Sequence, residues 1–265
     1  MPQTSTRTRS HFQIQRDVIY ALLLRELSSR FGKTRGGFIW VLVEPLAHLM
    51  FPVFIRGFIR QGLMPGVEFP IFIVYGILPF LLFKAICLQI VDGVNSGQGI
   101  LSYRQVLLMD VFIAKALAHF VIQAIVFPIV LIGLAMFGYD VLPVRPVELA
   151  GVIFLTVMLA FGLGLLFAAI TSLMPDARAI IKVMFMPLYF MSGILFPVTR
   201  FPDAWVQWMA LNPVLHLVEL SRVMAIEQYK PIKYLSIEYP VALALTTTVI
   251  GLMLYRMRYL ARVTR

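Results

Sequence analysis

The sequence predicts an all-α integral membrane protein: six transmembrane helices, an N-terminal amphipathic interface helix, and re-entrant helices between spans five and six. Its 265 residues are 60% hydrophobic and 14% charged, whereas soluble domains are about 45–50% apolar and about 25% charged. The apolar residues form separate runs, each near the roughly 20 helical residues that cross a bilayer. Most of the Lys and Arg residues flank these runs, as orientation in a membrane requires.

Residues 1–37 are predicted to be a cytoplasmic tail and an amphipathic interface helix, followed by a transmembrane domain over residues 38–265. The first 15 or so residues are polar and basic, and they lack the apolar stretch of a cleaved signal peptide. Residues 16–35 mix apolar positions with a basic face, which suits a helix lying in the membrane interface. Gly36 and Gly37 break this helix before the first span.

The spans are predicted at about 38–58, 70–91, 111–138, 148–173, 180–196 and 235–255, each helical because lipid offers the backbone no other partners. Fifteen of the 23 Lys and Arg residues fall on the side of the two termini and seven on the opposite side. Both termini are therefore expected in the cytoplasm. The net charge of +10 reflects this topology rather than nucleic-acid binding.

The connection over residues 197–234 is too apolar for a solvated loop. It contains "AWVQWMAL", with Trp205 and Trp208, and "VLHLVELSRVMAI", separated by Asn-Pro. Both segments are too short to span, so they are expected to enter the outer leaflet and return. At helical spacing, His216, Glu219 and Arg222 are predicted to pair with one another, because an unpaired buried charge is costly; a glycan contact is the alternative.

The sequence contains no recognisable catalytic or metal-binding constellation. It lacks a GxxxxGK[ST] phosphate loop and an HExxH motif, and Cys87 is its only cysteine. No catalytic residue, metal or cofactor is therefore expected on this chain, and any driving energy must come from another one. Small residues in span four are expected to allow close helix packing; they are Gly162, Gly164, Ala168 and Ala169.

The first span carries a carboxylate in "FIWVLVEPLAHLMF". Glu44 lies about 9 Å along the helix from Phe38 at ~1.5 Å per residue, His48 follows one turn later, and Pro45 introduces a kink. An intramembrane carboxylate is expected to face protein or water rather than lipid. Two interpretations stay open: a buried structural pair, or a residue that lines the path of the cargo.

Two cytoplasmic segments are candidate contacts for a partner. Ile100–Asp110 is predicted to be a short amphipathic helix whose polar members are Tyr103, Arg104, Gln105 and Asp110. Pro175–Lys182 forms a turn with Asp176 and Arg178. Each segment is either a solvated connector or a docking element.

The residues "LLLRELSSRFGKTRGGFIWVLVEPL", the six-span layout and the late "SGILFP…FPDAW…W…NPVLHLVELSR" resemble ABC-2-type exporter permeases. Among these, the chain is similar to the KpsM-type inner-membrane subunit of Gram-negative capsular polysaccharide exporters, over essentially its whole length. The resemblance implies the ABC-2 (type V exporter) fold in the inner membrane and a cargo of lipid-linked capsular polysaccharide.

The resemblance also implies partners. They are a second copy of this chain in a homodimer, two copies of a KpsT-like ATPase that binds ATP and Mg, a KpsE-like periplasmic co-polymerase and a KpsD-like outer-membrane channel. ATPase docking would fall on Tyr103, Arg104, Gln105 and neighbours including Asp110. Spans one and five would line the canal, and the re-entrant helices would close its outer mouth.

Aromatic side chains stack against flat rings without fixing a register, which suits a sliding polymer. The canal-lining candidates are Trp40, Glu44, His48, Phe51, Phe185 and Tyr189. Ordinary interfacial aromatics are the alternative. The basic residues Arg16, Arg25, Arg30, Lys33 and Arg35 are candidates to gather an anionic lipid-linked glycan at the cytoplasmic entrance, or else serve only as positive-inside anchors.

Other function classes remain open at this point. One is a permease for O-antigen, small molecules or lipids. Another is a membrane enzyme acting on lipid-linked sugars, which would need an acid/base pair or metal ligands facing a cavity.

Overall fold

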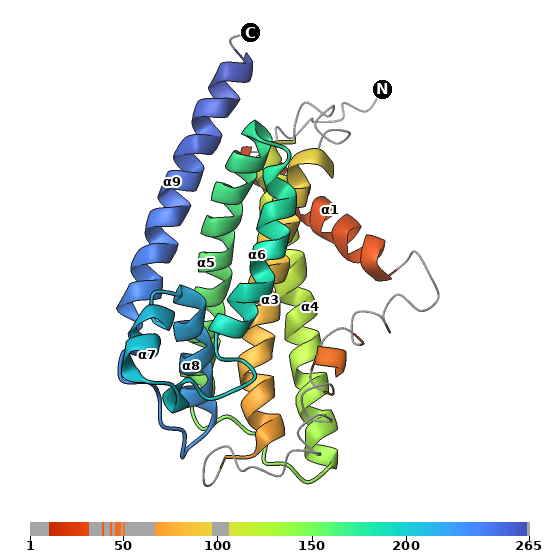
Figure 1. Ribbon diagram of the computed structural model, residues 1–265. Helices are drawn as coiled ribbons and strands as arrows, with labels where there is room; N and C mark the ends of the chain where they lie inside the picture. Colours follow the sequence, from red (N-terminus) through yellow and green to blue (C-terminus); the bar gives the residue numbers. More distant parts are fainter. Residues whose placement is uncertain are drawn as a thin grey trace, which may run out of the picture.

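The computed structural model describes residues 11–31, 67–96 and 106–263, together with the single positions 39, 43, 46–48 and 50. Its elements are helices (Figure 1). They are α1 (His11–Phe31), α3 (Phe69–Ser96), α4 (Leu108–Met136), α5 (Pro146–Leu173), α6 (Ala177–Met191), a 3-10 turn (Val198–Arg200), α7 (Asp203–Met209), α8 (Pro213–Ala225) and α9 (Glu238–Val263).

Four helices are long and apolar enough to cross a bilayer: α3, α4, α5 and α9. They coincide with four of the predicted spans, so the chain is a multi-pass membrane protein. The predicted fifth span, 180–196, differs: α6 starts at Ala177 and stops at Met191 after 15 residues. The predicted first span, 38–58, lies outside the continuously described ranges.

The long helices run side by side, with α3, α5 and α9 pointing one way and α4 the other (Figure 1). The C-terminal ends of α3 and α9, the α5–α6 turn and helix α1 gather at one end of the bundle. The short helices α7 and α8 gather toward the other end. The connection over residues 137–145 lies near α8, since its Val144 and Arg145 amides donate to the carbonyls of Ala225 and Met224 at 3.3 and 2.8 Å.

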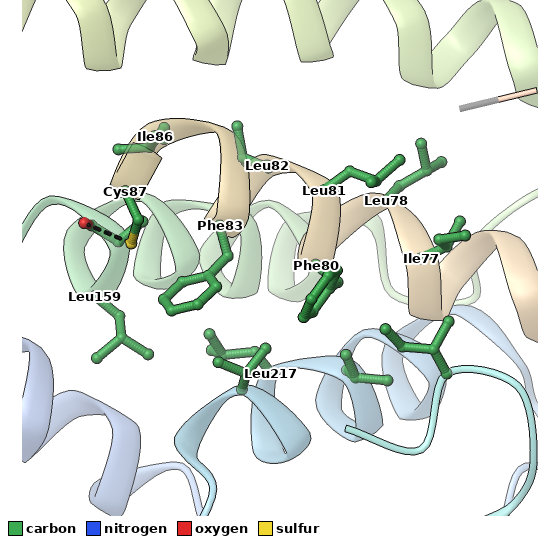
Figure 2. Packing of buried hydrophobic residues seen from close by; sticks show 14 of the residues in the cluster. Ile77, Leu78, Phe80, Leu81, Leu82, Phe83, Ile86, Cys87, Leu159 and Leu217 are labelled. Atoms are coloured by element: carbon green, nitrogen blue, oxygen red, sulfur yellow. Dashed lines mark hydrogen bonds between the residues drawn. The ribbon is translucent and has the colours of Figure 1, made fainter. Parts of the chain in front are cut away.

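Helix α3 is the core of the chain. Its most apolar window is 83% buried, against 22% for α9. Phe80, Phe83 and Ile86 pack with Leu159 of α5 and Leu217 of α8 (Figure 2). A helix that is apolar on every side and contacts protein on most of them is placed by packing rather than by lipid exposure.

Pro79 interrupts the hydrogen bonding of α3. Proline has no N–H, so the carbonyl of Tyr75, four residues earlier, loses its helical donor. The Ser221 hydroxyl of α8 donates to that carbonyl instead. The irregularity in α3 is therefore satisfied by a side chain from a distant part of the sequence.

Small residues bring α5 close to its neighbours, as predicted. A Cβ on Gly162 would lie 2.7 Å from the Thr248 hydroxyl of α9, and one on Gly164 would lie 2.9 Å from the Ile90 side chain of α3. On α9, a Cβ on Gly251 would lie 2.6 Å from Leu165. These helices can approach closely only because the glycines lack side chains.

Candidate functional site

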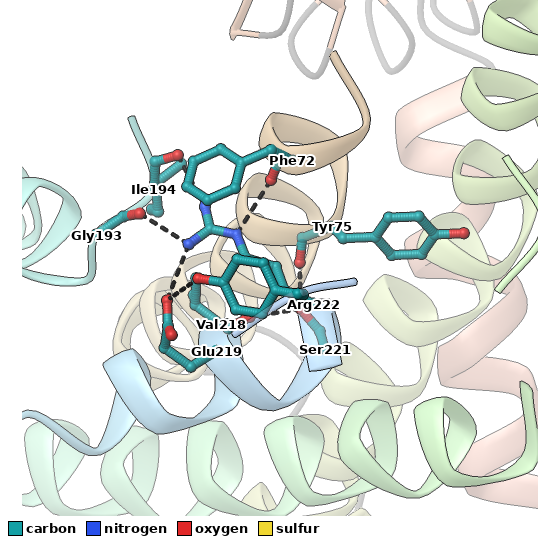
Figure 3. A network of polar contacts seen from close by, with 9 residues as sticks. Phe72, Tyr75, Gly193, Ile194, Val218, Glu219, Ser221 and Arg222 are labelled. Atoms are coloured by element: carbon teal, nitrogen blue, oxygen red, sulfur yellow. Dashed lines mark hydrogen bonds and ion pairs between the residues drawn. The ribbon is translucent and has the colours of Figure 1, made fainter. Parts of the chain in front are cut away.

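The most heavily bonded polar group of the described chain is the guanidinium of Arg222 on α8, which has no solvent-exposed surface. Its Nε donates to the Phe72 carbonyl of α3 at 3.1 Å, while Nη1 and Nη2 donate to the carbonyls of Gly193 and Ile194, each at 2.9 Å. Figure 3 shows the guanidinium between these three segments. One buried cation therefore joins α3, α8 and the segment after α6.

These bonds explain how α6 ends at Met191. The last carbonyls of a helix lack intrahelical donors, and irregular backbone at membrane depth must be satisfied by protein. Gly193 turns the chain with a φ of +66°, a conformation that favours glycine. Its carbonyl and the next one then meet Arg222. The guanidinium supplies the donors that lipid cannot.

Glu219 balances the buried charge. Its Oε1 accepts from Arg222 Nη1 at 3.2 Å and from the Tyr229 hydroxyl at 2.7 Å. Burial raises the pKa of Tyr229 above its ordinary range, so the phenol keeps its proton and acts as the donor. Glu219 is itself fully buried, and within the described residues its Oε2 has no hydrogen-bond partner.

Helix α3 is shaped to receive the guanidinium. The Phe72 ring stacks under it, with Cζ 3.5 Å from the ring centroid. A Cβ on Gly76 would overlap the guanidinium, with Arg222 Cζ at only 2.9 Å. Gly76 therefore leaves the space that Arg222 fills.

The predicted pairing of His216, Glu219 and Arg222 is confirmed for the last two and wrong for His216. Its Nε2 lies 2.8 Å from the Ala210 carbonyl, and its Nδ1 accepts from the Ser236 amide at 3.2 Å. This geometry assigns the neutral ring with the proton on Nε2. His216 faces the α7–α8 corner and the start of α9 rather than Glu219, because both of its nitrogens find backbone partners there.

The predicted short helices on either side of Asn-Pro are present as α7 and α8. Asn212 begins α8, where its Oδ1 accepts from the Val214 amide at 2.9 Å. Its Nδ2 donates to Ser192 Oγ, also at 2.9 Å, so the end of α6 is tied to the start of α8. Trp205 and Trp208 on α7 are 65% and 73% exposed, as suits interfacial anchors.

A second polar cluster, which we call the α1–α4 cluster, holds α1 against α4. Gln15 donates to Asp110 at 3.1 Å, and Lys115 pairs with Glu26 at 3.2 Å and with Gln89 of α3 at 3.1 Å. One turn beyond, the Arg30 guanidinium approaches His119 Nε2 at 2.9 Å. These polar contacts fix α1 on the bundle by specific side chains.

Asp92, near the C-terminal end of α3, forms ion pairs with two basic residues in the first turns of α6. Arg178 Nη2 and Lys182 Nζ approach its Oδ1 at 2.6 and 3.5 Å. Helix α6 is thus held at both ends, by Asp92 at one and by Arg222 at the other.

The residues predicted to line the canal differ in how exposed they are within one chain. Phe185 is 3% exposed and packs on Phe83 at 6.0 Å, and the half-buried Tyr189 packs on Phe80 at 5.2 Å. His48 lies 6.4 Å from Tyr189 between ring centroids. Within one chain, both α6 aromatics face α3. Trp40, Glu44 and Phe51 lie outside the described residues.

The residues predicted for the cargo entrance and for ATPase docking also differ in exposure and in their partners. Arg16 and Arg25 are exposed, whereas Arg30 turns toward α4. Asp110 lies in the first turn of α4, not in a separate helix, and its 1% exposed carboxylate accepts from Gln15 and from the Leu107 amide. Lys33, Arg35, Tyr103, Arg104 and Gln105 lie outside the described residues.

Several residues of these sites were not predicted from the sequence: Gly76, Asp92, Gly193 and Tyr229 in particular. Asp92 carried a usable signal, because an acid at the end of a span close to the predicted Arg178 turn invites an ion pair. No such signal marks Gly76, Gly193 or Tyr229, since a glycine or tyrosine within an apolar stretch does not indicate that a cation from a distant segment packs against it.

Comparison of the sequence with known proteins identifies the family of the chain. The model of the ABC-2 type transporter family matches residues 17–226. The chain is 34% identical over 256 residues to the polysialic acid transport protein KpsM of Escherichia coli, covering 97% of this chain and 99% of that protein.

Other relatives share less of the sequence. The capsule polysaccharide export inner-membrane protein CtrC of Neisseria meningitidis serogroup A is 26% identical over 79% of each chain. The corresponding protein BexB of Haemophilus influenzae is 28% identical over 82% of each chain. With a family match across most of its length and a full-length relative at this identity, the chain belongs to the ABC-2 type transporter family.

Proposed function

We propose that this chain is the membrane-spanning subunit of an ATP-driven exporter that moves lipid-linked capsular polysaccharide across the Gram-negative inner membrane. The observation that carries the proposal is the alignment over 97% of the chain with a polysialic acid transport protein. The weaker likenesses to two capsule export proteins point to the same class of cargo.

In this proposal two copies of the chain form the path and two copies of a separate ATPase supply the energy. Both termini face the cytoplasm, where α1, the ion pairs of Asp92 with Arg178 and Lys182, and the docking candidates Tyr103, Arg104 and Gln105 meet the ATPase and the cargo. The exposed guanidinium groups of Arg16 and Arg25 are the described candidates to gather an anionic glycolipid.

The short helix α6 is the element best suited to border the path. It is fixed at both ends yet keeps much of its surface uncovered within one chain, including Val183 at 71% and Met186 at 68% exposed. A second copy, the cargo, or both would cover this surface in the assembled exporter. The α7–α8 corner would then lie at the outer mouth.

Deleting the gene in its encapsulated host tests the proposal. We expect capsular polysaccharide to disappear from the surface and accumulate inside the cell, with export restored by the wild-type chain. Normal surface capsule with a defect in O-antigen, or in efflux of small molecules, would assign a different cargo. Turnover of a lipid-linked sugar by the purified chain without an ATPase would replace the transport proposal with an enzyme.

A further inference from the structure

A lined pocket between α3, α4 and α5 has no role in the function proposed above. It encloses about 160 Å³. Its floor is the Pro79 region of α3, with Tyr75 and Leu82, and its walls include Phe120 of α4 and Leu149 of α5. A cavity of about 150 Å³ with apolar walls stays dry and accepts hydrocarbon.

The chemistry of the lining favours an apolar ligand. Gln123 and Tyr75 are the pocket's only side chains with polar groups, and each already donates to a backbone carbonyl. Gln123 donates to the Leu78 carbonyl at 3.3 Å, and the Tyr75 hydroxyl donates to the Val141 carbonyl at 2.6 Å. The space left over is bordered by methylene, methyl and aromatic groups, which favour an acyl chain.

The pocket opens toward lipid. Ala124 and Ala150 line it and are exposed, and Phe120 beside them is 38% exposed. All three helices that form it are membrane spans by length and composition. The apolar windows of α4 and α5 are only 28% and 39% buried, which leaves apolar outer faces of the kind that lipid covers. The small side chains of the two alanines leave the mouth open to it.

A basic residue lies one helical turn from the pocket lining. Arg145 precedes α5, one turn before Leu149, and its side chain is exposed without an ion pair among the described residues. Glu148 and Asp140 are the acidic groups nearby in sequence. A phosphate whose acyl chain lies in the pocket would reach the level of Arg145, because one helical turn is about 5.4 Å.

From this arrangement we propose that the pocket binds one acyl chain of a membrane phospholipid, with the lipid phosphate on Arg145. The site needs neither the cargo nor the ATPase, so it stands or falls separately from the proposed transport function. Occupancy by lipid would also pack against Pro79, where α3 is irregular.

Photolabelling of the full-length chain tests the site. The chain is reconstituted in vesicles of phosphatidylethanolamine and phosphatidylglycerol that include a phosphatidylglycerol with a diazirine in one acyl chain. After irradiation, adducts are mapped by mass spectrometry. We expect them to concentrate on the pocket residues of α4 and α5, well above those on exposed lipid-facing positions such as Phe154 and Met253.

Matched variants give the proposal its sharpest test. Ala124→Phe or Ala150→Phe fills the mouth and should lower pocket adducts to the level of the exposed positions. Ala135→Phe, at an exposed site of α4 outside the pocket, should not. Arg145→Gln should lower pocket labelling about fivefold, the factor for one basic residue beside an anionic headgroup, whereas Arg256→Gln at the other end of the bundle should have no effect.

Two results would overturn the site. Adducts spread evenly over the exposed faces of α4, α5 and α9, and unchanged by the filling variants, would mean bulk lipid only. Disulfide cross-linking between two copies through Ala124→Cys, with no pocket labelling, would mean that protein covers the mouth.

Discussion

Arg222 is a cation placed where a cation is costly, and three carbonyls, one carboxylate and one aromatic ring make it tolerable. Arg222 stabilises the segment after α6, because the carbonyls of Gly193 and Ile194 lie outside any helix and would otherwise face apolar surroundings; the Phe72 carbonyl of α3 is its third backbone acceptor. Removing one member of such a buried group leaves the rest unsatisfied, which costs more than the pair was worth.

We therefore expect Arg222→Gln to destabilise the chain by about 3–5 kcal/mol. The measurement is thermal unfolding in detergent, followed by size-exclusion chromatography. Arg256→Gln, at an exposed site on α9, should change stability by less than ~0.5 kcal/mol. Equal effects of the two substitutions would contradict the capping role of Arg222.

Gly76→Ala should be nearly as harmful although it adds a single methyl group. The new Cβ would displace the guanidinium, which has no second position with donors matched to three carbonyls. Gly133→Ala on α4 is the control, because a Cβ there has no atom within 4 Å. It should leave stability unchanged or raise it by up to about 1 kcal/mol. The two glycine variants are compared in the same unfolding assay.

Helix α1 is an element attached by polar side chains rather than by burial of an apolar stripe. Lys115 and Glu26 are 9% and 20% exposed, so water screens their pair in part. Reversing either charge should loosen α1, and the exchange Glu26→Lys with Lys115→Glu should recover part of the loss. We expect a coupling of about 1 kcal/mol in the double-mutant cycle, measured by hydrogen exchange of α1. Complete additivity would show that the two residues do not interact.

The exposed basic face of α1 leads to a separate functional prediction. Reversing Arg16 and Arg25 to Glu should lower export roughly thirtyfold, since each basic residue near an anionic surface contributes ~1 kcal/mol. Surface polysaccharide at equal protein level is the measurement. Arg30 is a poor choice for this test, because its substitution would also disturb His119. Unchanged export in the double reversal would reduce the basic face to a membrane anchor.

At the level of the elements, the spacing of residues in the sequence predicts the structure well where lipid or helix geometry determines that spacing. The long spans, the Asn-Pro break between α7 and α8 and the Glu219–Arg222 spacing all follow from local rules. The end of α6 did not, because it depends on a guanidinium that approaches from α8, nearly thirty residues later. For the same reason Arg30 looked like a surface cation: its partner His119 is 89 residues away.

For the whole molecule, the arrangement predicts a topology. The ion pairs of Asp92, helix α1 and the C-terminal end of α9 share one end of the bundle, and the distribution of Lys and Arg predicts that this end is cytoplasmic. The native Cys87 is fully buried, so a maleimide should react with introduced cysteines and not with Cys87. Asp140 and Asp176 lie in connections at opposite ends of the bundle.

Asp140→Cys should react with a membrane-impermeant maleimide in cells whose outer membrane has been permeabilised. Asp176→Cys should react only after the inner membrane is opened. The unmodified chain should remain unlabelled in both conditions. The reverse pattern would invert the orientation and, with it, the sides assigned to α1 and to the α7–α8 corner.

The Tyr75 carbonyl, freed by Pro79 and taken up by Ser221, also has a consequence during synthesis. The two residues are 146 positions apart, and ribosomes add about 5–20 residues per second. The first described span must therefore enter the membrane with an unmatched backbone group and wait on the order of ten seconds for its donor. A nascent chain released before α8 emerges would keep this unmatched carbonyl in α3, the most buried helix of the bundle.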